Sequence, residues 1–305
     1  YTTASSALAG SAIELTRRDA NGSVQWTRSY QTPPADRYEH PATLAIRPSG
    51  NVMLGGTTRM LDTNADVGGL LMKIASDGSL LWRVGAELGL SSVVKVLVDA
   101  AGNNYVLGMS TPVSGASAVA TLVKVGGDGA VLWTWHDTVG IGAANNPVWS
   151  GDGRLIAAGG ALGPQVGFAV VDPASGAASV IKTYGGRAPV DVASDAAGDI
   201  YFVHVGAPTC RCTIVTRNTS DGSQVWQLAS GSQSAISQIE MSPDGALVLS
   251  GNSDLTYHVW KFTRDAQAVW QTGDAVFTDG RINGPMTIDA KGNVIFPTNM
   301  NTVRT

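Results

Sequence analysis

A short phrase that returns six times constrains the fold of this chain more than any other feature. Each copy is a tight turn closed by Gly, or once by Ala, with an aromatic or aliphatic residue four positions later, and the turns recur every 44 to 56 residues. Such a period, filled with strand-forming residues, is typical of a β-propeller, in which each repeat forms one four-stranded blade. The copies are Asn21-Gly22…Trp26, Asp77-Gly78…Trp82, Asp128-Gly129…Trp133, Ser175-Gly176…Val180, Asp221-Gly222…Trp226 and Asp265-Ala266…Trp270.

A second phrase alternates with the first and consists of a hairpin turn followed by a short apolar run. Glycine supplies the positive φ that such turns require, and the apolar runs are too short for helices. We therefore expect almost no helix and assign the second phrase to the inner hairpin of each blade, the first phrase to the outer hairpin. The turns of the second phrase close at Gly50, Gly102, Gly153, Gly198, Gly245 and Gly292.

The order of the two phrases predicts how the blades are assembled. The chain begins with an outer hairpin and ends with an inner one, so the N-terminal hairpin of residues 8–30 is expected to pair with the C-terminal hairpin of residues 281–298. This pairing would complete a blade and remove open sheet edges. The prediction is one all-β domain over residues 1–305, a six-bladed β-propeller of four-stranded antiparallel blades closed into a ring. The blades span about 41–89, 90–140, 141–186, 187–231, 232–280, and 281–305 with 1–40.

Charge and composition exclude some function classes. The net charge is −4 and the longest basic run is Arg17-Arg18, which disfavours binding to nucleic acid or to an anionic membrane. No apolar stretch approaches the length of a transmembrane helix. The chain starts at Tyr1 without Met, and it is poor in Lys but rich in Ala, Gly, Ser and Thr. These features predict a processed bacterial protein that is secreted, extracellular or on the cell surface, with the periplasm as an alternative.

The tryptophans and cysteines have structural interpretations. The eight Trp residues, most of them in the repeats, are expected to pack between blades. Cys210 and Cys212 flank a single residue and are predicted to form a disulfide in an oxidising compartment; two free thiols are the alternative. A metal site at this pair would need further ligands, and His204 is the nearby candidate.

Candidate ligand-binding residues lie in the loops that connect one blade to the next. The longest of these loops is Ser29–Ala42, and its counterparts bring further charged and aromatic side chains to the same face. A glycan or a peptide would suit such a surface; the alternative is that each residue is a solvated loop residue. Glu240 and Asp191 are interpreted as polar channel-lining residues rather than as a catalytic pair. The candidates are Tyr38, Glu39, His40, His136, Asp137, Arg187, Asp279 and Arg281.

One loop carries oxygen ligands at alternating positions. Asp62, Asn64 and Asp66 resemble the start of a calcium loop, but Val67 and Lys73 stand where an EF-hand needs Gly and Glu. An EF-hand is excluded. A loose Ca²⁺ site remains an alternative to an ordinary polar loop, and no other cofactor is expected.

Stretches such as Gly69–Trp82 and Thr121–Trp133 resemble the LVKxDxDGxxxW repeat of bacterial secreted β-propeller repeat proteins, which are also described as PQQ-like repeat proteins. The resemblance covers essentially the whole chain and implies the fold and export. It implies no activity, because fold does not fix function. Quinoprotein dehydrogenases have eight blades and a vicinal cysteine pair, and sialidases place the aromatic residue three positions after Gly; this chain departs from both.

The sequence therefore predicts a non-catalytic extracellular module that recognises a protein or glycan through its loop face. Self-association into a surface layer or filament is a version of the same prediction. The alternative function is a glycan-active hydrolase or lyase, for which His136 beside Asp137 offers a base but no evident nucleophile.

Overall fold

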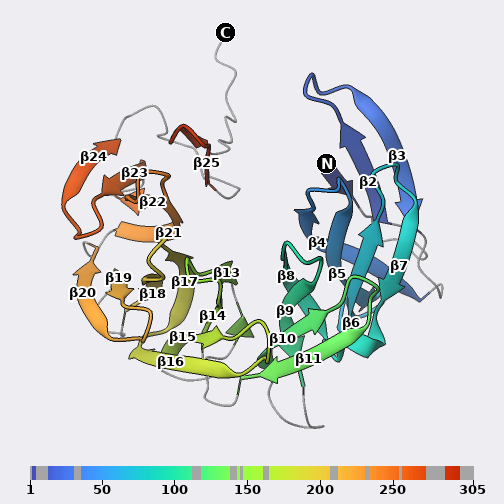
Figure 1. The fold of residues 1–305 in the computed structure, drawn as a ribbon, viewed down its shortest axis with the longest axis horizontal. Coiled ribbons are helices and arrows are strands. Elements are labelled where there is room, and N and C mark those ends of the chain that lie inside the picture. The colour runs from blue at the N-terminus through green and yellow to red at the C-terminus, as the bar shows by residue number, and fades with distance from the viewer. Residues whose placement is uncertain are drawn as a thin grey trace. The chain divides into compact units, whose positions relative to one another are not determined.

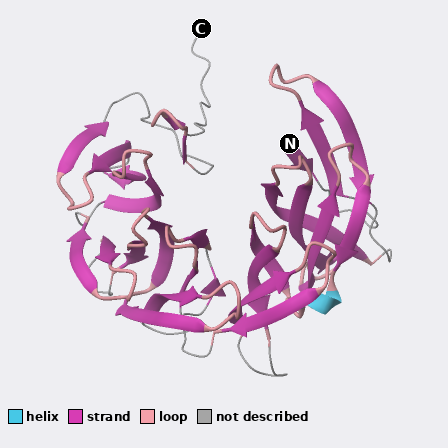
Figure 2. Cartoon of the chain, in the orientation of Figure 1, coloured by secondary structure: helices cyan, strands magenta, loops and turns pink. Residues whose placement is uncertain are grey.

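The computed structural model describes residues 2–4, 13–30, 36–111, 118–137, 143–144, 147–160, 165–206, 212–230, 234–253, 256–272 and 286–295. Within these ranges the regular structure is almost entirely β-strand, and the exception is one short 3₁₀ helix, Ala86–Leu88 (Figure 2). The expectation of an all-β chain is confirmed. None of the helices among the described residues is long and apolar enough to cross a membrane.

The chain divides into two compact units, Tyr1–Thr138 and Val139–Thr305. The strands of the first unit are β1 (Thr2–Ala4), β2 (Ile13–Arg18), β3 (Val24–Tyr30), β4 (Arg37–Ile46), β5 (Val52–Met60), β6 (Asp66–Ile74), β7 (Leu80–Val84), β8 (Ser92–Val98), β9 (Asn104–Ser110), β10 (Val119–Val125) and β11 (Val131–His136). Those of the second unit are β12 (Ala143–Ala144), β13 (Val148–Trp149), β14 (Leu155–Gly160), β15 (Gln165–Val171), β16 (Ala178–Gly185), β17 (Ala188–Ser194), β18 (Ile200–Val205), β19 (Thr213–Asn218), β20 (Gln224–Ala229), β21 (Ser234–Met241), β22 (Leu247–Ser253), β23 (Thr256–Phe262), β24 (Ala268–Thr272), β25 (Thr287–Ile288) and β26 (Val294–Ile295).

The strands form meandering antiparallel blades in chain order (Figure 1). Complete blades are β4–β7 and β8–β11 in the first unit, and β17–β20 and β21–β24 in the second. In β12–β16 the innermost strand is split into the short segments β12 and β13, which both pair with β14. Each blade contains one inner and one outer hairpin, as the two sequence phrases predict.

The turn residues explain where the hairpins form. Every glycine that closes one of the repeated turns has a positive φ, between 75° and 96°, which costs other residues free energy. Ala266 takes the same conformation with a φ of 60° at the turn where the repeat lacks glycine. Asp side chains help to fix the turns: Asp289, for example, accepts hydrogen bonds of 2.8 Å from the backbone N–H groups of Lys291 and Asn293.

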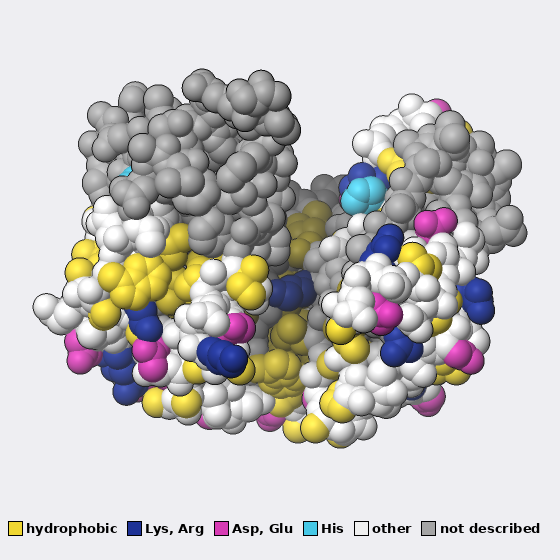
Figure 3. All heavy atoms as spheres, turned by 90° about the horizontal axis from the view of Figure 1, so that it is seen from above, with side chains coloured by type: hydrophobic (Ala, Val, Ile, Leu, Met, Phe, Trp, Pro, Cys, Tyr) yellow, Lys and Arg dark blue, Asp and Glu magenta, His cyan; other side chains and the backbone are white. Residues whose placement is uncertain are grey.

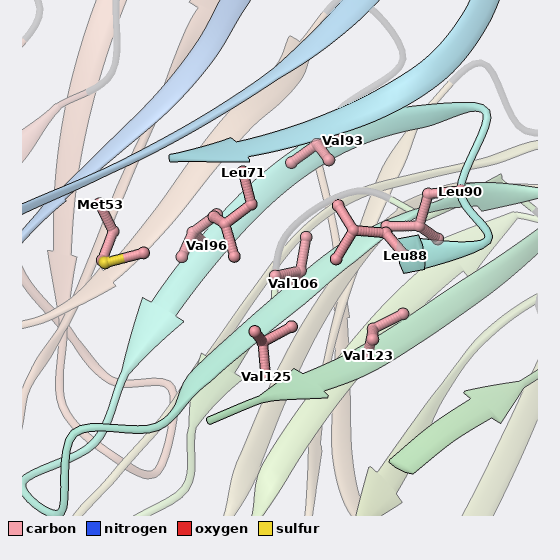
Figure 4. Close-up of a cluster of buried hydrophobic side chains, with 9 residues drawn as sticks. All are labelled: Met53, Leu71, Leu88, Leu90, Val93, Val96, Val106, Val123 and Val125. Atoms are coloured by element: carbon pink, nitrogen blue, oxygen red, sulfur yellow. The ribbon is translucent and has the colours of Figure 1, made fainter. Parts of the chain in front are cut away.

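Hydrophobic cores lie between successive blades. One core joins β4–β7 to β8–β11, and Figure 4 shows side chains such as Met53, Leu71 and Val106 converging in it. In the second unit, Phe168 and Phe202 meet edge to face with ring centroids 5.8 Å apart, joining β12–β16 to β17–β20. Burial of these faces removes apolar surface from water and is the main force that holds neighbouring blades together.

The tryptophans of the repeat link one blade to the next. The indole Nε1 of Trp26 donates to the main-chain oxygen of Ser76 at 3.0 Å, that of Trp82 to Gly127 at 2.9 Å, and that of Trp226 to Arg264 at 3.1 Å. Each acceptor is the second residue of the next outer turn, two positions before the residue that closes it. The prediction that these residues pack between blades is confirmed at these three joints.

The two ends of the chain form incomplete sheets. At the N-terminus β2 and β3 pair as the predicted outer hairpin, and β1 pairs with the remaining edge of β2, a strand that the sequence phrases do not reveal. At the C-terminus the inner hairpin consists of β25 and β26 alone among the described residues. The described residues therefore form repeated propeller blades, a three-stranded sheet at the N-terminus and a two-stranded hairpin at the C-terminus.

Candidate functional site

The blade β4–β7 extends further at its loop end than the other blades. Its first three strands are nine or ten residues long. The first two strands of the other complete blades have six to eight residues. The extra ladder pairs Arg37 with Met60 and Arg59 with Asp66. The result is a three-stranded platform that carries the start of β4 and the β5–β6 turn.

This platform brings together two sets of residues that the sequence suggested separately. The hydroxyl of Tyr38, from the proposed ligand face, donates a hydrogen bond to Oδ1 of Asn64, from the proposed calcium loop. On the same hairpin, Nε of Arg59 donates to Oδ1 of Asp66 at 2.7 Å. Tyr38 is buried, while Arg59 and Asp66 remain partly exposed. Bonds to neighbours therefore hold this polar cluster in one arrangement.

Glu39 lies on the opposite face of β4 from Tyr38 and is fully buried, at 0% exposed. Its Oε1 accepts a charge-assisted hydrogen bond from Arg83 on β7, and its Oε2 has no hydrogen-bond partner. Burial raises the pKa of this carboxyl above its usual range, and the nearby Arg83 guanidinium opposes the shift. His40, the next residue, is exposed.

His136 lies at the end of β11, opposite Thr121. Its Nδ1 is 3.1 Å from the Thr121 hydroxyl and 3.4 Å from the Ser110 hydroxyl, and the two hydroxyls are 2.6 Å apart. The contact between an imidazole and a hydroxyl is what a nucleophile and its base require. However, Ser110 and Thr121 are 2% and 0% exposed, so a substrate could not reach either oxygen. Asp137 beside it is also buried.

The second unit holds the remaining candidates. Arg187 is exposed at the end of the β16–β17 connection, directly before β17, and its backbone N–H donates to the Val205 oxygen at 3.1 Å. Asp279 and Arg281 lie outside the described residues. Asp191 is buried and its Oδ2 accepts a 3.0 Å hydrogen bond from the Ile239 N–H on the next blade, which is a structural role.

The cysteine region is described only in part. Cys212 is buried and disulfide-bonded. Cys210, its predicted partner, lies outside the described residues, so the pairing stays a prediction. His204 lies nearby in sequence at the end of β18, stacked on Tyr184 and Phe202 with ring centroids 5.3 and 5.5 Å apart. Burial lowers its pKa, and its Nε2 has no hydrogen-bond partner.

Metal binding has little support in the part of the chain that the structure describes. Nowhere in it do three His, Cys, Asp or Glu side chains gather as metal ligands do. A calcium ion on the β5–β6 turn would compete with Arg59 for Asp66 and with Tyr38 for Asn64. The Ca²⁺ site therefore stays a prediction, which a calcium titration would test.

A cluster of charged residues joins two blades of the second unit. Oδ2 of Asp199 accepts hydrogen bonds from Arg217 at 2.9 Å and from Arg264 on the next blade at 2.8 Å. Arg217 also pairs with Asp265 at 2.6 Å, and Arg264 lies 3.0 Å from Asp195. Burial and the neighbouring Asp195 raise the pKa of Tyr201, whose hydroxyl donates to Asp195, to about 12. These charged groups pair with one another across the joint between the two blades.

Several of these partners could not be found from the sequence. Arg59 and Arg83 belong to no recognisable motif, and Ser110 and Thr121 lie in strands whose sequence does not set them apart. One feature of the sequence could have indicated these two arginines. Arg59 and Arg83 interrupt apolar strands close to loops that carry acidic residues. On the face shown in Figure 3, basic and acidic side chains are interspersed, in agreement with the absence of a basic run in the sequence.

Comparison with known proteins identifies the architecture. No family model matches the chain, and no curated protein matches it in sequence. Solved structures do match: the Dos1 propeller at 13% identity and TM-score 0.62, over 94% of this chain and 71% of that one. A chain of the mitotic checkpoint complex matches at 14% identity and TM-score 0.61, over 96% and 85%. Virginiamycin B lyase from Staphylococcus aureus matches at 11% identity and TM-score 0.56, over 85% and 80%. At these identities the similarity defines the fold, a β-propeller of repeated blades, and leaves the activity open.

Proposed function

We propose that this chain is a six-bladed β-propeller, closed by its terminal hairpins, that acts as a non-catalytic extracellular binding or assembly module. Its partner is a protein or a glycan, recognised through the loop end of the blades and chiefly through the β4–β7 platform. The alternative is a glycan-active hydrolase or lyase on the same scaffold.

The proposed closure rests on the repeated pairing of a tryptophan with a basic residue, which recurs on the last complete blade. At three joints a tryptophan and a basic residue lie opposite each other, and the indole donates to the main-chain oxygen of the second residue of the next outer turn. The corresponding Trp270 is 39% exposed, and Lys261 opposite it pairs with Asp244 within its own blade. The β2–β3 turn at Asp19–Gly22 has the same form as the capped turns.

The binding role rests on the organisation of the β4–β7 platform. Tyr38, Asn64, Arg59 and Asp66 are fixed by mutual bonds, so little side-chain entropy remains to be lost when a partner docks. Exposed His40 and Asp62 flank them and offer further polar contacts. A rigid cluster of donors and acceptors beside an aromatic ring suits a polar ligand such as a glycan or a peptide loop.

Catalysis by this platform has weaker support. Glycoside hydrolysis needs two carboxyl groups that face one substrate. Here Glu39 is buried against Arg83 and Asp66 is paired with Arg59. The hydroxyl groups that contact His136 belong to Ser110 and Thr121, which are buried, so a substrate cannot reach them. These pairings favour recognition over turnover.

A bacterial, extracellular location is proposed on separate grounds. Cys212 is disulfide-bonded, and disulfides persist mainly in oxidising compartments such as the periplasm and the extracellular space. The LVKxDxDGxxxW resemblance and the low Lys content point the same way.

A glycan array with the purified chain tests the binding role. The wild type is expected to bind one class of oligosaccharide, and the double variant His40→Ala/Arg59→Ala is expected to lose that binding. Arg154→Ala, on a turn at the other end of a blade, is the matched control and should bind as the wild type does. Release of new reducing ends from a bound glycan would instead establish the hydrolase alternative. Binding that survives in the double variant would place recognition elsewhere and contradict the proposal.

One observation favours the assembly version. The outermost strands expose apolar side chains in several blades, and edge strands of this kind can pair with another chain. Light scattering over a concentration series should reveal a polymer, and Leu81→Lys/Leu132→Lys should shorten it. A strictly monomeric chain would remove the assembly version and leave soluble binding. The exposed residues are Leu80, Leu81, Val131, Leu132, Val225 and Val269.

A further inference from the structure

Two Asn-X-Ser/Thr triplets occur in the chain, and this triplet is the sequence that N-linked glycosylation requires. The first, Asn21-Gly22-Ser23, lies in the β2–β3 turn, and the second, Asn218-Thr219-Ser220, begins at the last residue of β19 and runs into the β19–β20 turn. The two triplets are equivalent as sequence patterns. Their surroundings in the fold are different.

The asparagine of the second triplet is part of the protein interior. Asn218 is 0% exposed, and its Nδ2 donates to the Thr216 hydroxyl at 3.2 Å. Its Oδ1 accepts a hydrogen bond from the Tyr184 hydroxyl on the preceding blade. A sugar on Nδ2 of Asn218 would have to displace these contacts. The second triplet therefore has a structural role in the folded chain.

The asparagine of the first triplet is open to solvent. Each residue from Asp19 to Gln25 is exposed. The carboxamide of Asn21 and the hydroxyl of Ser23 form no hydrogen bond with the other residues that the structure describes. A side-chain carbon added to Gly22, between them, would meet no other atom within 4 Å. The two side chains that define the triplet are thus accessible together.

The backbone of this turn is held by groups other than those two side chains. The Gly22 N–H donates to the Asp19 main-chain oxygen at 3.0 Å. Oδ1 of Asp19 accepts from the N–H groups of Asn21 and Ser23, each at 2.9 Å. Nη1 of Arg18 donates to the Gly22 oxygen at 2.9 Å. The turn therefore presents the Asn21 carboxamide and the Ser23 hydroxyl in an ordered backbone without using either group.

Packing of a neighbouring blade against such a turn does not cover the acceptor positions. The β6–β7 turn has Trp26 of the preceding hairpin packed on it, and its Gly78 is buried. Asp77 and Ser79, which correspond to Asn21 and Ser23, nevertheless remain exposed. The accessibility of Asn21 is therefore independent of what packs beside the β2–β3 turn. The β10–β11 turn repeats the pattern, with Gly129 buried and Asp128 and Ala130 exposed.

We propose that Asn21 is a site of N-linked glycosylation, with a lipid pyrophosphate-linked oligosaccharide as the glycan donor. Nδ2 of Asn21 forms a bond to the anomeric carbon of the first sugar, and the bond from that carbon to the pyrophosphate oxygen breaks. Nδ2 loses one proton, the lipid pyrophosphate leaves, and nothing is oxidised or reduced. The site lies on an outer hairpin and not on the β4–β7 platform, so this modification is separate from the proposed binding role.

Glycan transfer to the purified, folded chain tests the proposal. The chain is incubated with a single-subunit oligosaccharyltransferase of Asn-X-Ser/Thr specificity and its lipid-linked donor, and the products are mapped by mass spectrometry. Unfolded synthetic peptides of residues 16–26 and 213–223 show what the enzyme accepts from each sequence.

Three variants separate the acceptor from its surroundings. Asn21→Gln removes the acceptor nitrogen, and Ser23→Ala removes the hydroxyl of the triplet while Asn21 stays. Ser223→Ala is the matched control, because Ser223 has the same place in the β19–β20 turn, where its main-chain oxygen accepts from Thr219 as that of Ser23 does from Asp19.

The expected result is a glycan on Asn21 of the folded chain, lost in Asn21→Gln and Ser23→Ala and kept in Ser223→Ala. Asn218 should be modified about tenfold less or lower still, because it must first be released by local unfolding. Transfer to the 16–26 peptide but not to the folded chain would show that the turn does not admit the enzyme and would overturn the proposal. No transfer to either would show that the sequence is not an acceptor. Equal transfer to Asn21 and Asn218 in the folded chain would contradict the argument from burial.

Discussion

The indole Nε1 of Trp82 lies 2.9 Å from the main-chain oxygen of Gly127, and the ammonium group of Lys73 lies 2.8 Å from the same oxygen. One backbone oxygen thus accepts hydrogen bonds from two side chains of the preceding blade. Arg17 and Trp26 share the Ser76 oxygen in the same way, at 2.8 and 3.0 Å. The cationic residue and the indole face one another across the outer hairpin, so the repeat places both at once.

Replacing Trp82 with Phe should lower the free energy of unfolding by about 1 kcal/mol or somewhat more, because it removes one hydrogen bond and leaves a small packing defect. Urea denaturation followed by circular dichroism measures the loss. Leu81→Ala on the same strand is the control: Leu81 is 49% exposed, and its truncation should change the stability little. Equal losses in the two variants would show that the indole bond does not hold the blades together.

Asp199→Asn should destabilise the chain strongly, by about 3–5 kcal/mol, because it leaves two arginines beside a buried neutral amide. The carboxylate of Asp199 is buried and serves both Arg217 and Arg264. Asp265 also pairs with Arg217, but the Asp265 side chain is 79% exposed. Asp265→Asn should therefore lower the free energy of unfolding much less than Asp199→Asn does. The two midpoints of urea unfolding should therefore be well separated; coincident midpoints would contradict the assigned roles.

His204 should make the fold sensitive to acid. Its folded pKa lies below the unfolded value because burial disfavours the imidazolium. The unfolded chain therefore binds a proton first, and stability should fall as the pH drops below about 6.5 toward the folded pKa. His204→Phe, which preserves the stack with Tyr184 and Phe202, should lose this part of the pH dependence. The same change at partly buried His258 should leave the contribution of His204 intact, and melting temperatures from pH 7.5 to 5 measure all three chains.

Glu39 should affect the pH dependence of stability in the opposite direction to His204. Its folded pKa is raised by burial, so the ionised carboxylate costs stability at neutral pH, and that cost is relieved as the pH falls through the folded pKa. Relative to Glu39→Gln, the wild type should therefore become more stable between pH 7 and pH 4.5. Asp66→Asn, on the same platform but partly exposed, serves as the control. A stability difference that does not change with pH would show that Arg83 offsets the burial fully.

The blade pattern followed from the sequence because it depends on local geometry. Gly22 or Gly245 must adopt a positive φ wherever a tight hairpin turn is needed, and the residues that follow alternate as strands do. The position of Trp226 four residues after its turn glycine is equally local. These features repeat, and repetition made the inner and outer hairpins recognisable without any tertiary information.

The site was only partly predictable. Tyr38, Glu39 and His40 were singled out as one loop, but adjacent residues of a strand point to opposite faces. Tyr38 therefore meets Asn64, whereas Glu39 is buried against Arg83. Arg83 is far from Glu39 in the chain and belongs to no motif. The Ser110–Thr121–His136 contact likewise joins three strands, and its lack of accessible hydroxyl oxygens could not be read from residue types.

The sequence by itself determined the all-β class, the repeating hairpins, their turns and the tryptophans that join neighbouring blades. These are properties of short segments, whose backbone preferences act before any long-range contact forms. Tertiary structure decided which charged groups are buried, which pair with one another, and that the N-terminal segment adds β1 to the edge of β2. Those outcomes depend on strand register and on burial, because pairing strengths and pKa values change when groups distant in sequence leave water together.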